Sequence, residues 1–243
     1  MENTSLIALS RQSVLRRQMD IVANNLANMN TTAYKGQRMM FIEQLVKSKG
    51  GERVLPEKLA FVRDIATVRE LDEGPIQATG NTLDVAIRGE GYFTIDTPDG
   101  ERYTRSGRFQ LDSEGQLVTS HGFPVLSDAG QPFIFASTDT QIDIARDGTI
   151  STENGVLGRL RLVKFQNEND LKEAYGGLYA TDQLPEDVAE PVFVQHAIEG
   201  SNVNPILEIT RMIDVQRSYE AAKKLIDAED ERMKTAISEL AKV

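Results

Sequence analysis

Two narrow stripes of apolar residues, one at each end of the chain, constrain this sequence more than any other feature. The stripe near the N-terminus has spacings of four, three, four and three, and consists of Leu15, Met19, Val22, Leu26 and Met29. Such spacing puts the side chains along one edge of a helix, as in a coiled coil. No glycine or proline interrupts residues 1–35. We therefore predict a helix over roughly the first thirty residues, ending at Asn28–Thr32, where Asn and Thr compete for backbone hydrogen bonds.

The C-terminal end of the chain repeats this pattern. Its stripe has spacings of three, four, three and four, and consists of Met212, Val215, Tyr219, Ala222 and Ile226, with Met233 continuing the register. Asn204-Pro205 suits a helix start, because asparagine caps free N–H groups and proline is favoured at the first helical position. We predict one helix over residues 204–240, roughly 55 Å long at ~1.5 Å per residue.

Between the two helices the period of about 3.6 disappears and turn signals recur. They are Pro98–Gly100, Asp112–Gly115, Asp128–Gly130, Asp147-Gly148 and Asn154-Gly155. Short β-rich runs alternate with these turns, at Leu83–Ile87, Tyr92–Ile95, Arg108–Leu111, Gln116–Thr119, Gln141–Ile144 and Arg159–Phe165. Many short strands joined by turns predict an all-β domain that closes into a barrel or a sandwich.

The predicted fold class is therefore α+β, with the terminal helices packed as a coiled-coil-like pair and a central β domain. We divide the chain into an N-terminal helix and signature, an extended connector, the β domain, a return connector and a C-terminal helix, at residues 1–35, 36–80, 81–180, 181–203 and 204–243. The connector over 36–80 has no clear period, and Phe41–Lys47 within it could extend a helix. Pro185, Pro191 and Gly200 keep the return connector irregular or extended.

Each stripe is narrow and suits a partner helix rather than a broad core. The simplest arrangement pairs the two ends with each other, either within one chain alone or in a bundle completed by neighbouring copies. The asparagines near the end of the first helix could form hydrogen bonds between copies, although capping or solvated roles are the alternative. We expect the assembly interface to comprise Leu15, Met19, Val22, Asn24, Asn25, Leu26, Asn28, Met29, Met212, Val215, Tyr219, Ala222, Ile226 and Met233.

Composition argues against several other classes of protein. The net charge is −10, from 37 acidic and 27 basic side chains, so phosphate backbones repel the chain and we expect no nucleic-acid partner. Cysteine is absent and there are only two histidines, which disfavours thiolate or imidazole metal sites. No carboxylate pair suggests catalysis. We therefore predict no catalytic residue, no cofactor and no metal, and we expect neither membrane insertion nor a signal peptide.

Several longer motifs resemble the flagellar rod and hook protein family. The N-terminal motif is Met19–Asn28 followed by Asn30–Lys35, with the core A-N-N-L-A-N. Further similar segments are Glu73–Asn81, Leu83–Ile87, Gly89–Phe93, Tyr103–Phe109, Glu199–Asn204 and Met212–Glu220. The resemblance covers essentially the whole chain. Two departures are visible, since Ala33-Tyr34 stands where Gly-Phe is commoner, and Thr82 replaces a frequent proline.

The resemblance implies a structural subunit of the bacterial flagellar basal body and not an enzyme, most like the proximal-rod members, with the distal rod as the alternative. It implies assembly with other copies and with other rod proteins, export by the flagellar type III apparatus without a cleaved signal peptide, a place in the rod that crosses the periplasm, and torque transmission from motor to hook. A secreted binding module whose β domain recognises a ligand, and a hydrolase with a carboxylate pair in that domain, are the competing classes.

Overall fold

The computed structural model describes residues 2–47 and 58–240. The chain divides into two compact units, each built from separate stretches of sequence. We call the first the helical unit, formed by Met1–Asn28, Gly36–Glu70 and Val203–Val243, and the second the β unit, formed by Met29–Lys35 and Leu71–Asn202. The coarse prediction of two terminal helices and a central β-rich region is confirmed.

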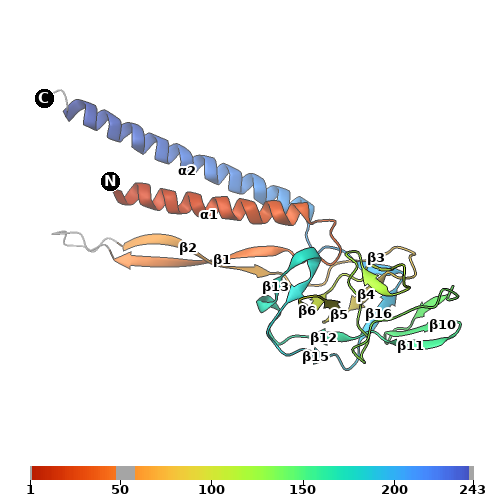
Figure 1. Cartoon of the computed structure of the whole chain (residues 1–243). Coiled ribbons are helices and arrows are strands. Elements are labelled where there is room, and N and C mark those ends of the chain that lie inside the picture. Colours follow the sequence, from red (N-terminus) through yellow and green to blue (C-terminus); the bar gives the residue numbers. More distant parts are fainter. Residues whose placement is uncertain (1, 48–57, 241–243) are drawn as a thin grey trace. The chain divides into compact units, whose positions relative to one another are not determined.

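The helical unit contains α1 (Glu2–Ala27) and α2 (Pro205–Leu240), which contact each other and run antiparallel (Figure 1). Both helices match their predicted bounds closely. The Asn204 side chain accepts a hydrogen bond from the backbone N–H of Ile206 at 3.1 Å, so the predicted cap forms and Pro205 occupies the first helical position. Coiled-coil geometry in this pair stays a prediction.

A long β-hairpin completes the helical unit. Its strands β1 (Gln37–Lys47) and β2 (Lys58–Arg69) pair antiparallel, with a bulge between Met40 and Phe41, and both contact α1. The sequence predicted an extended connector in this region and a possible helix over Phe41–Lys47, so the pairing was missed and the helix alternative was wrong. Ten residues separate the strands, whereas the strongest hairpin signals come from two-residue turns.

The largest sheet of the β unit has six strands in the order β13-β14-β6-β5-β12-β15. Their bounds are Lys172–Glu173, Tyr179–Ala180, Gly100–Thr104, Tyr92–Thr97, Leu162–Lys164 and Glu186–Asp187. Core residues lie on both faces of this sheet. On β5, Phe93 and Ile95 pack in the main cluster with Phe109 and Phe193, whereas Tyr92 packs in a second cluster with Phe165. The sheet is therefore buried from two sides.

Smaller antiparallel sheets surround this core. They are β9 (Ile142–Ile144), β10 (Thr149–Thr152) and β11 (Gly155–Arg159) in one sheet, and the pairs β3 (Ile76–Ala78) with β17 (Ala197–Glu199), β4 (Val85–Arg88) with β16 (Val192–Gln195), and β7 (Phe109–Leu111) with β8 (Leu117–Thr119). Two short 3-10 turns cover Glu168–Asp170 and Tyr175–Gly177. Within the described residues these strands form no closed barrel, because they are divided among separate sheets and the two end strands of the largest sheet do not pair.

The predicted return connector over 181–203 contributes to these sheets. It supplies β15, β16 and β17, so the β unit extends beyond the predicted 81–180 boundary. The predicted run Arg159–Phe165 is divided between β11 and β12. The predicted turns are confirmed in their glycines, since Gly100, Gly115, Gly130, Gly148 and Gly155 all have positive φ. Across residues 2–47 and 58–240, no helix combines the length and apolar character needed to cross a membrane.

Candidate assembly surface

The predicted interface residues differ in how far the chain itself covers them. Four are buried within the helical unit, namely Val22, Asn25, Val215 and Ala222. Seven are half-buried, namely Leu15, Met19, Leu26, Asn28, Met212, Tyr219 and Ile226, while Asn24, Met29 and Met233 are exposed. Met29 lies beyond α1, in the segment that belongs to the β unit. The two stripes therefore cover each other only in part, which leaves area for a further contact.

Asn25 joins the three parts of the helical unit. Its side-chain amide donates to the Gln37 carbonyl and its amide oxygen accepts from the Gln37 N–H, both at 2.9 Å. The same amide donates to Glu208 of α2 at 3.3 Å, and Glu208 in turn accepts from Arg211. Asn25 and Glu208 are 3% and 4% exposed. The side chain of Asn25 therefore holds α1, β1 and α2 together, a use within the chain that sequence reasoning did not foresee.

Asn24 and Asn28 lie toward solvent at the end of α1. The Asn28 side-chain amide donates to the Asn24 carbonyl at 2.9 Å and to its side-chain oxygen at 3.0 Å. The backbone N–H of Asn28 also donates to the Asn24 carbonyl at 3.1 Å. This arrangement satisfies carbonyl groups at the helix end, in line with the capping alternative for Asn28. Asn24 keeps an exposed side chain, so its predicted interface role stays a prediction.

Two groups of large aliphatic side chains on α2 are exposed. The first, which we call the base patch, comprises Ile206, Ile209 and Ile213 at 76%, 47% and 45% exposure. The second, the tip patch, comprises Met233, Ile237 and Leu240 at 43%, 66% and 78%. The sequence placed Met233 and Leu240 on the C-terminal apolar stripe, and the predicted interface included Met233 alone among these six residues. The sequence did contain a signal for the base patch, because Ile206, Ile209 and Ile213 are three and four residues apart and so form a second apolar edge on the helix.

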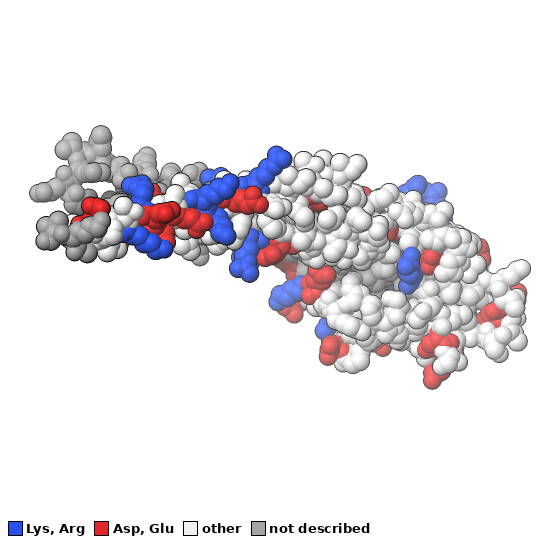
Figure 2. Space-filling view, turned by 90° about the horizontal axis from the view of Figure 1, so that it is seen from above, with Lys and Arg blue, Asp and Glu red and all other residues white. Residues whose placement is uncertain are grey.

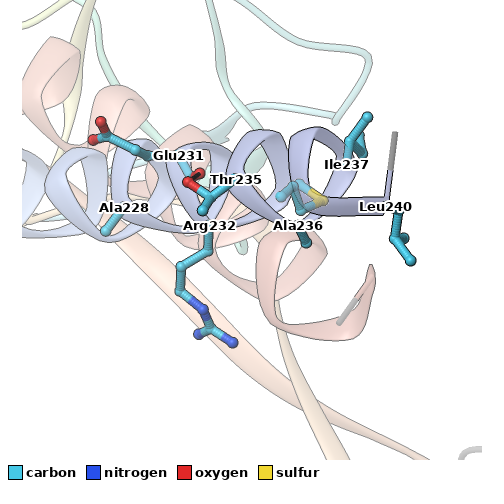
Figure 3. A pocket seen from close by; sticks show the side chains of 8 residues that line it. Ala228, Glu231, Arg232, Thr235, Ala236, Ile237 and Leu240 are labelled. Carbon is cyan, nitrogen blue, oxygen red and sulfur yellow. Dashed lines mark hydrogen bonds between the residues drawn. The ribbon is translucent and has the colours of Figure 1, made fainter. Parts of the chain in front are cut away.

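Most of the remaining α2 surface is polar, although Leu207 and Leu225 are also exposed. Acidic and basic side chains alternate along the helical unit in the view from above (Figure 2). Three ion pairs lie within α2, from Arg211 to Glu208, from Arg232 to Glu229 at 2.9 Å and from Lys234 to Asp230 at 2.6 Å. Exposed pairs of this kind contribute little to stability, because water and salt screen their charges. Within this charged surface, the base patch and the tip patch are groups of exposed aliphatic side chains. Figure 3 shows two members of the tip patch, Ile237 and Leu240.

A buried ionic cluster lies within the β unit. Glu199 accepts from the Lys35 ammonium at 2.7 Å and from the Arg105 guanidinium at 2.5 Å. The backbone N–H of Gly74 donates to the same carboxylate at 2.9 Å. Arg105 also donates to the carbonyls of Gly91 and Gly89, at 3.1 and 2.6 Å. Lys35, Arg105 and Glu199 are at most 5% exposed, so both cations and the anion are compensated inside the protein.

The electrostatics of this cluster favour the charged carboxylate. Burial alone would raise the pKa of Glu199, but Arg105 and Lys35 outweigh it and hold that pKa below its usual 4.5. Burial lowers the pKa of Lys35, with the hydrogen bond to Glu199 acting in the opposite direction. Because the surrounding donors keep the Glu199 carboxylate charged, it serves to hold the fold together rather than to transfer a proton.

Three segments that connect the β unit to the rest of the chain meet at this cluster. Lys35 donates to the Asp72 carbonyl at 2.7 Å, and the Asn202 side chain donates to the same carbonyl at 3.0 Å. Gly74 packs so closely on Gly200 that a Cβ atom at Gly74 would lie 2.0 Å from the Gly200 carbonyl oxygen. The cluster thus ties residues 29–35, 71–74 and 199–202 together. Sequence reasoning quoted these motifs but did not foresee that they converge.

No arrangement in the described part of the chain gathers three or more His, Asp or Glu side chains that could hold a metal ion. The features that could bind a partner are the apolar patches on the helical unit. In the β unit, the charges of Lys35, Arg105 and Glu199 compensate one another.

Three protein-family models match the chain. The model for the flagella basal body rod protein matches residues 6–35, the flagellar hook protein FlgE/F/G D1 domain matches 86–152, and the flagellar basal body rod FlgEFG protein C-terminal model matches 194–239. They correspond to α1 with its signature, to much of the β unit, and to the last strands with α2.

Full-length relatives agree with these matches. The chain is 38% identical to the flagellar basal-body rod protein FlgF of Caulobacter vibrioides, with 100% of both chains covered. It is 33% identical to FlgF of Mesorhizobium japonicum, covering 97% of this chain and 98% of the relative. It is also 37% identical to the flagellar basal-body rod protein FlgG of Buchnera aphidicola, covering 88% and 91%.

Proposed function

Since the chain belongs to the flagellar basal-body rod protein family, we propose that it is a subunit of the proximal rod that assembles axially through its terminal helices. The family consists of structural subunits of the flagellar basal body, and this chain is one of them. The observation that carries the finer assignment is the alignment with an FlgF protein over the full length of both chains. FlgG relatives of similar identity cover less of the chain.

The distal rod is the second candidate, and the FlgG relatives favour it. The FlgG of Buchnera aphidicola described above is 37% identical, nearly as much as the FlgF of Caulobacter vibrioides, but its alignment leaves 12% of this chain uncovered. The two assignments differ in position along the rod and in neighbours, not in the kind of contact. Locating the chain in isolated rods separates them.

The helical unit supports assembly through the chain ends. It takes α1 and α2 from opposite ends of the sequence, covers their apolar stripes only in part and exposes two aliphatic patches. An amphipathic pair that leaves such surface in water gains free energy when neighbouring helices cover it, at roughly 25 cal/mol per Å² of apolar area. The partners in this proposal are further copies and other rod proteins.

Torque transmission belongs to the same proposal. Load applied to the helical unit passes along the chain into residues 29–35, 71–74 and 199–202, which Glu199 and Asp72 hold together. Buried charge-assisted hydrogen bonds are roughly twice as strong as neutral ones, and several that share one carboxylate resist shear together. The junction is therefore suited to carrying a mechanical load without local unfolding.

Export by the flagellar type III apparatus, without a cleaved signal peptide, is the route that this proposal includes. It places the subunit in the part of the basal body that crosses the periplasm. The rod family model matches residues 6–35, so the family signature lies in α1 and in the segment that follows it. In this proposal the export apparatus accepts a subunit whose residues 6–35 carry the family signature.

The test is a variant that lacks residues 205–240 and keeps the N-terminal signature. We expect loss of swimming and absence of the chain from purified basal bodies, while near-UV circular dichroism shows a folded β unit. A binding module would keep its ligand recognition in this variant. Normal swimming with the truncated chain incorporated would contradict the proposal.

A further inference from the structure

The turn between β10 and β11 holds the only Asn-Gly pair in the sequence, Asn154-Gly155. The two strands form a hairpin in which Thr152 lies opposite Gly155 (Figure 1). Asn154 and Gly155 are both exposed, and a Cβ atom at Gly155 would meet no non-neighbouring atom of the described residues within 4 Å. Gly155 has a φ of 138°, a conformation that favours glycine. The backbone of this turn therefore keeps a glycine directly after Asn154.

An asparagine followed by glycine can react with the backbone of its own chain. The backbone nitrogen of Gly155 attacks the side-chain carbonyl carbon (Cγ) of Asn154 and a C–N bond forms. The side-chain nitrogen leaves as ammonia, taking the proton that the Gly155 nitrogen gives up. Water then opens the five-membered imide ring at one of its two carbonyl groups, which yields aspartate or isoaspartate. Glycine favours the first step, because it has no Cβ atom to hinder the approach of its nitrogen.

Asn154 and its neighbour Glu153 hold a second segment against the turn, residues 136–141, which we call the 136–141 loop. The Asn154 side-chain amide donates to the Asp139 carboxylate at 2.5 Å. The Glu153 carboxylate accepts from the backbone N–H of Thr140 at 2.8 Å. This hydrogen bond is the main reason that the pKa of Glu153 is lowered to about 2. Glu153 is therefore charged near neutral pH, and the Asn154 amide is the donor between two carboxylates.

We propose that Asn154 is a site of spontaneous deamidation, and that the reaction releases the 136–141 loop from the turn. A carboxylate in place of the amide removes the donor to Asp139 and brings two like charges to the same short distance. Isoaspartate also adds one backbone carbon before Gly155, so the pairing of Thr152 with Gly155 loses its register. Water is the only co-reactant. The Asn154 side chain must first leave Asp139, which an exposed turn at the end of a hairpin permits at low cost.

Asn81 provides a matched control within the same chain. It is exposed like Asn154, and its side-chain amide also donates to a carboxylate, that of Asp84, at 3.1 Å. The residue after it is Thr82, whose Cβ atom carries two heavy atoms that crowd the approach to the backbone nitrogen. The two asparagines therefore differ chiefly in the residue that follows them.

The experiment incubates the full chain at mildly alkaline pH, under conditions in which circular dichroism shows it folded, and follows each asparagine by peptide mass spectrometry. We expect Asn154 to convert at least about tenfold faster than Asn81, a factor that corresponds to about 1.4 kcal/mol in activation free energy. Both aspartate and isoaspartate should form. Digestion in water that carries heavy oxygen marks any conversion during sample preparation, because water opens the ring.

Two results would overturn the assignment of the site. One is an intact Asn154 at the end of the incubation, and the other is equal conversion of Asn154 and Asn81. Either result leaves the proposed function untouched, since neither concerns assembly.

Two variants test the release of the loop separately from the reaction. Asn154→Asp places the aspartate product in the turn and should speed hydrogen exchange at the backbone N–H groups of Ala136 and Thr140 about tenfold, because Asp139 and Glu153 accept from them. Asn81→Asp adds the same charge at the matched site and should leave this exchange unchanged. Unchanged exchange in Asn154→Asp, or the same increase in both variants, would contradict the release of the loop.

Discussion

The two units of this protein use their apolar and charged residues in opposite ways. The β unit buries its aromatic core and its only fully enclosed ion cluster among the described residues, at Lys35, Arg105 and Glu199. The helical unit leaves Ile206, Ile237 and Leu240 more than 60% exposed. The β unit also leaves Val156, Tyr175 and Leu184 more than 60% exposed, but these lie far apart in the sequence, whereas the exposed aliphatic side chains of α2 recur every three or four residues along one helix. The difference indicates that the β unit supplies stability and the helical unit supplies contacts.

The largest expected effect sharpens this contrast in the β unit. Glu199→Gln removes the charge that compensates Lys35 and Arg105, which stay buried. Breaking a buried ion pair from one side costs about 3–5 kcal/mol. Urea unfolding, followed through the near-UV signal of the buried Tyr92 and Tyr103, measures this loss in the free energy of unfolding. Glu190→Gln, at an exposed position, should change the free energy of unfolding by less than about 0.5 kcal/mol. Similar losses for both variants would contradict the compensating role.

Acid titration probes the same cluster through its protons. The pKa of Glu199 is lower in the folded chain than its usual 4.5, so the stability that it provides is fully present above that pH. It is lost as pH falls from about 4.5 toward the lower folded-state pKa, because the unfolded chain binds the proton first. We expect the unfolding free energy of wild type to fall more steeply in this window than that of Glu199→Gln. Parallel curves would exclude the linkage.

In the helical unit, the neighbouring residues Asn25 and Asn24 provide a test variant and its control. Asn25→Ala leaves the N–H and carbonyl of Gln37 without their partners and should cost about 2–3 kcal/mol. Asn24→Ala changes an exposed side chain and should cost less than about 0.5 kcal/mol, while reducing incorporation if the predicted interface role holds. Thermal unfolding followed by far-UV circular dichroism compares them. A larger loss for Asn24→Ala would reverse the roles assigned to them.

The smallest effect concerns Ala33, which stands where a glycine is commoner in the family pattern. Its φ is 58°, in the left-handed region that costs a non-glycine residue about 1–2 kcal/mol. Ala33→Gly removes this cost but adds flexibility to the unfolded chain, so we expect a net gain of about 0.5–1 kcal/mol. Denaturant unfolding measures it. A loss of stability would mean that packing of the buried methyl group outweighs the backbone strain.

Local signals explain why the helices and turns could be predicted from the sequence. The stripes from Leu15 and Met212 repeat every three or four residues, and the cap at Asn204 lies next to the helix that it starts. The strands between the glycine turns follow from the same kind of short-range pattern. The strands form no closed barrel and the sandwich alternative is not confirmed, because local sequence signals do not determine how such short strands pair into sheets.

The missed features depend on contacts between distant positions. Lys35 and Glu199 are 164 positions apart, and Asn25 and Glu208 are 183 apart. Lys35 and Glu199 appeared in the sequence only as parts of motifs, Asn25 was assigned to the interface between copies, and Glu208 was not singled out. Only the fold shows that they are buried partners within the chain. The pairing of β1 with β2 was missed for a related reason, since the ten residues between them leave no short turn signal.

The central claim is that neighbouring rod subunits complete the helical unit. A density map of purified basal bodies, with this chain located in it, tests that claim most directly. We predict that α1 and α2 of every copy pack against helices of adjacent subunits, with Ile206, Ile209, Ile237 and Leu240 covered. Density in which these side chains of α2 face solvent, or in which the rod is held together by the β units alone, would contradict it.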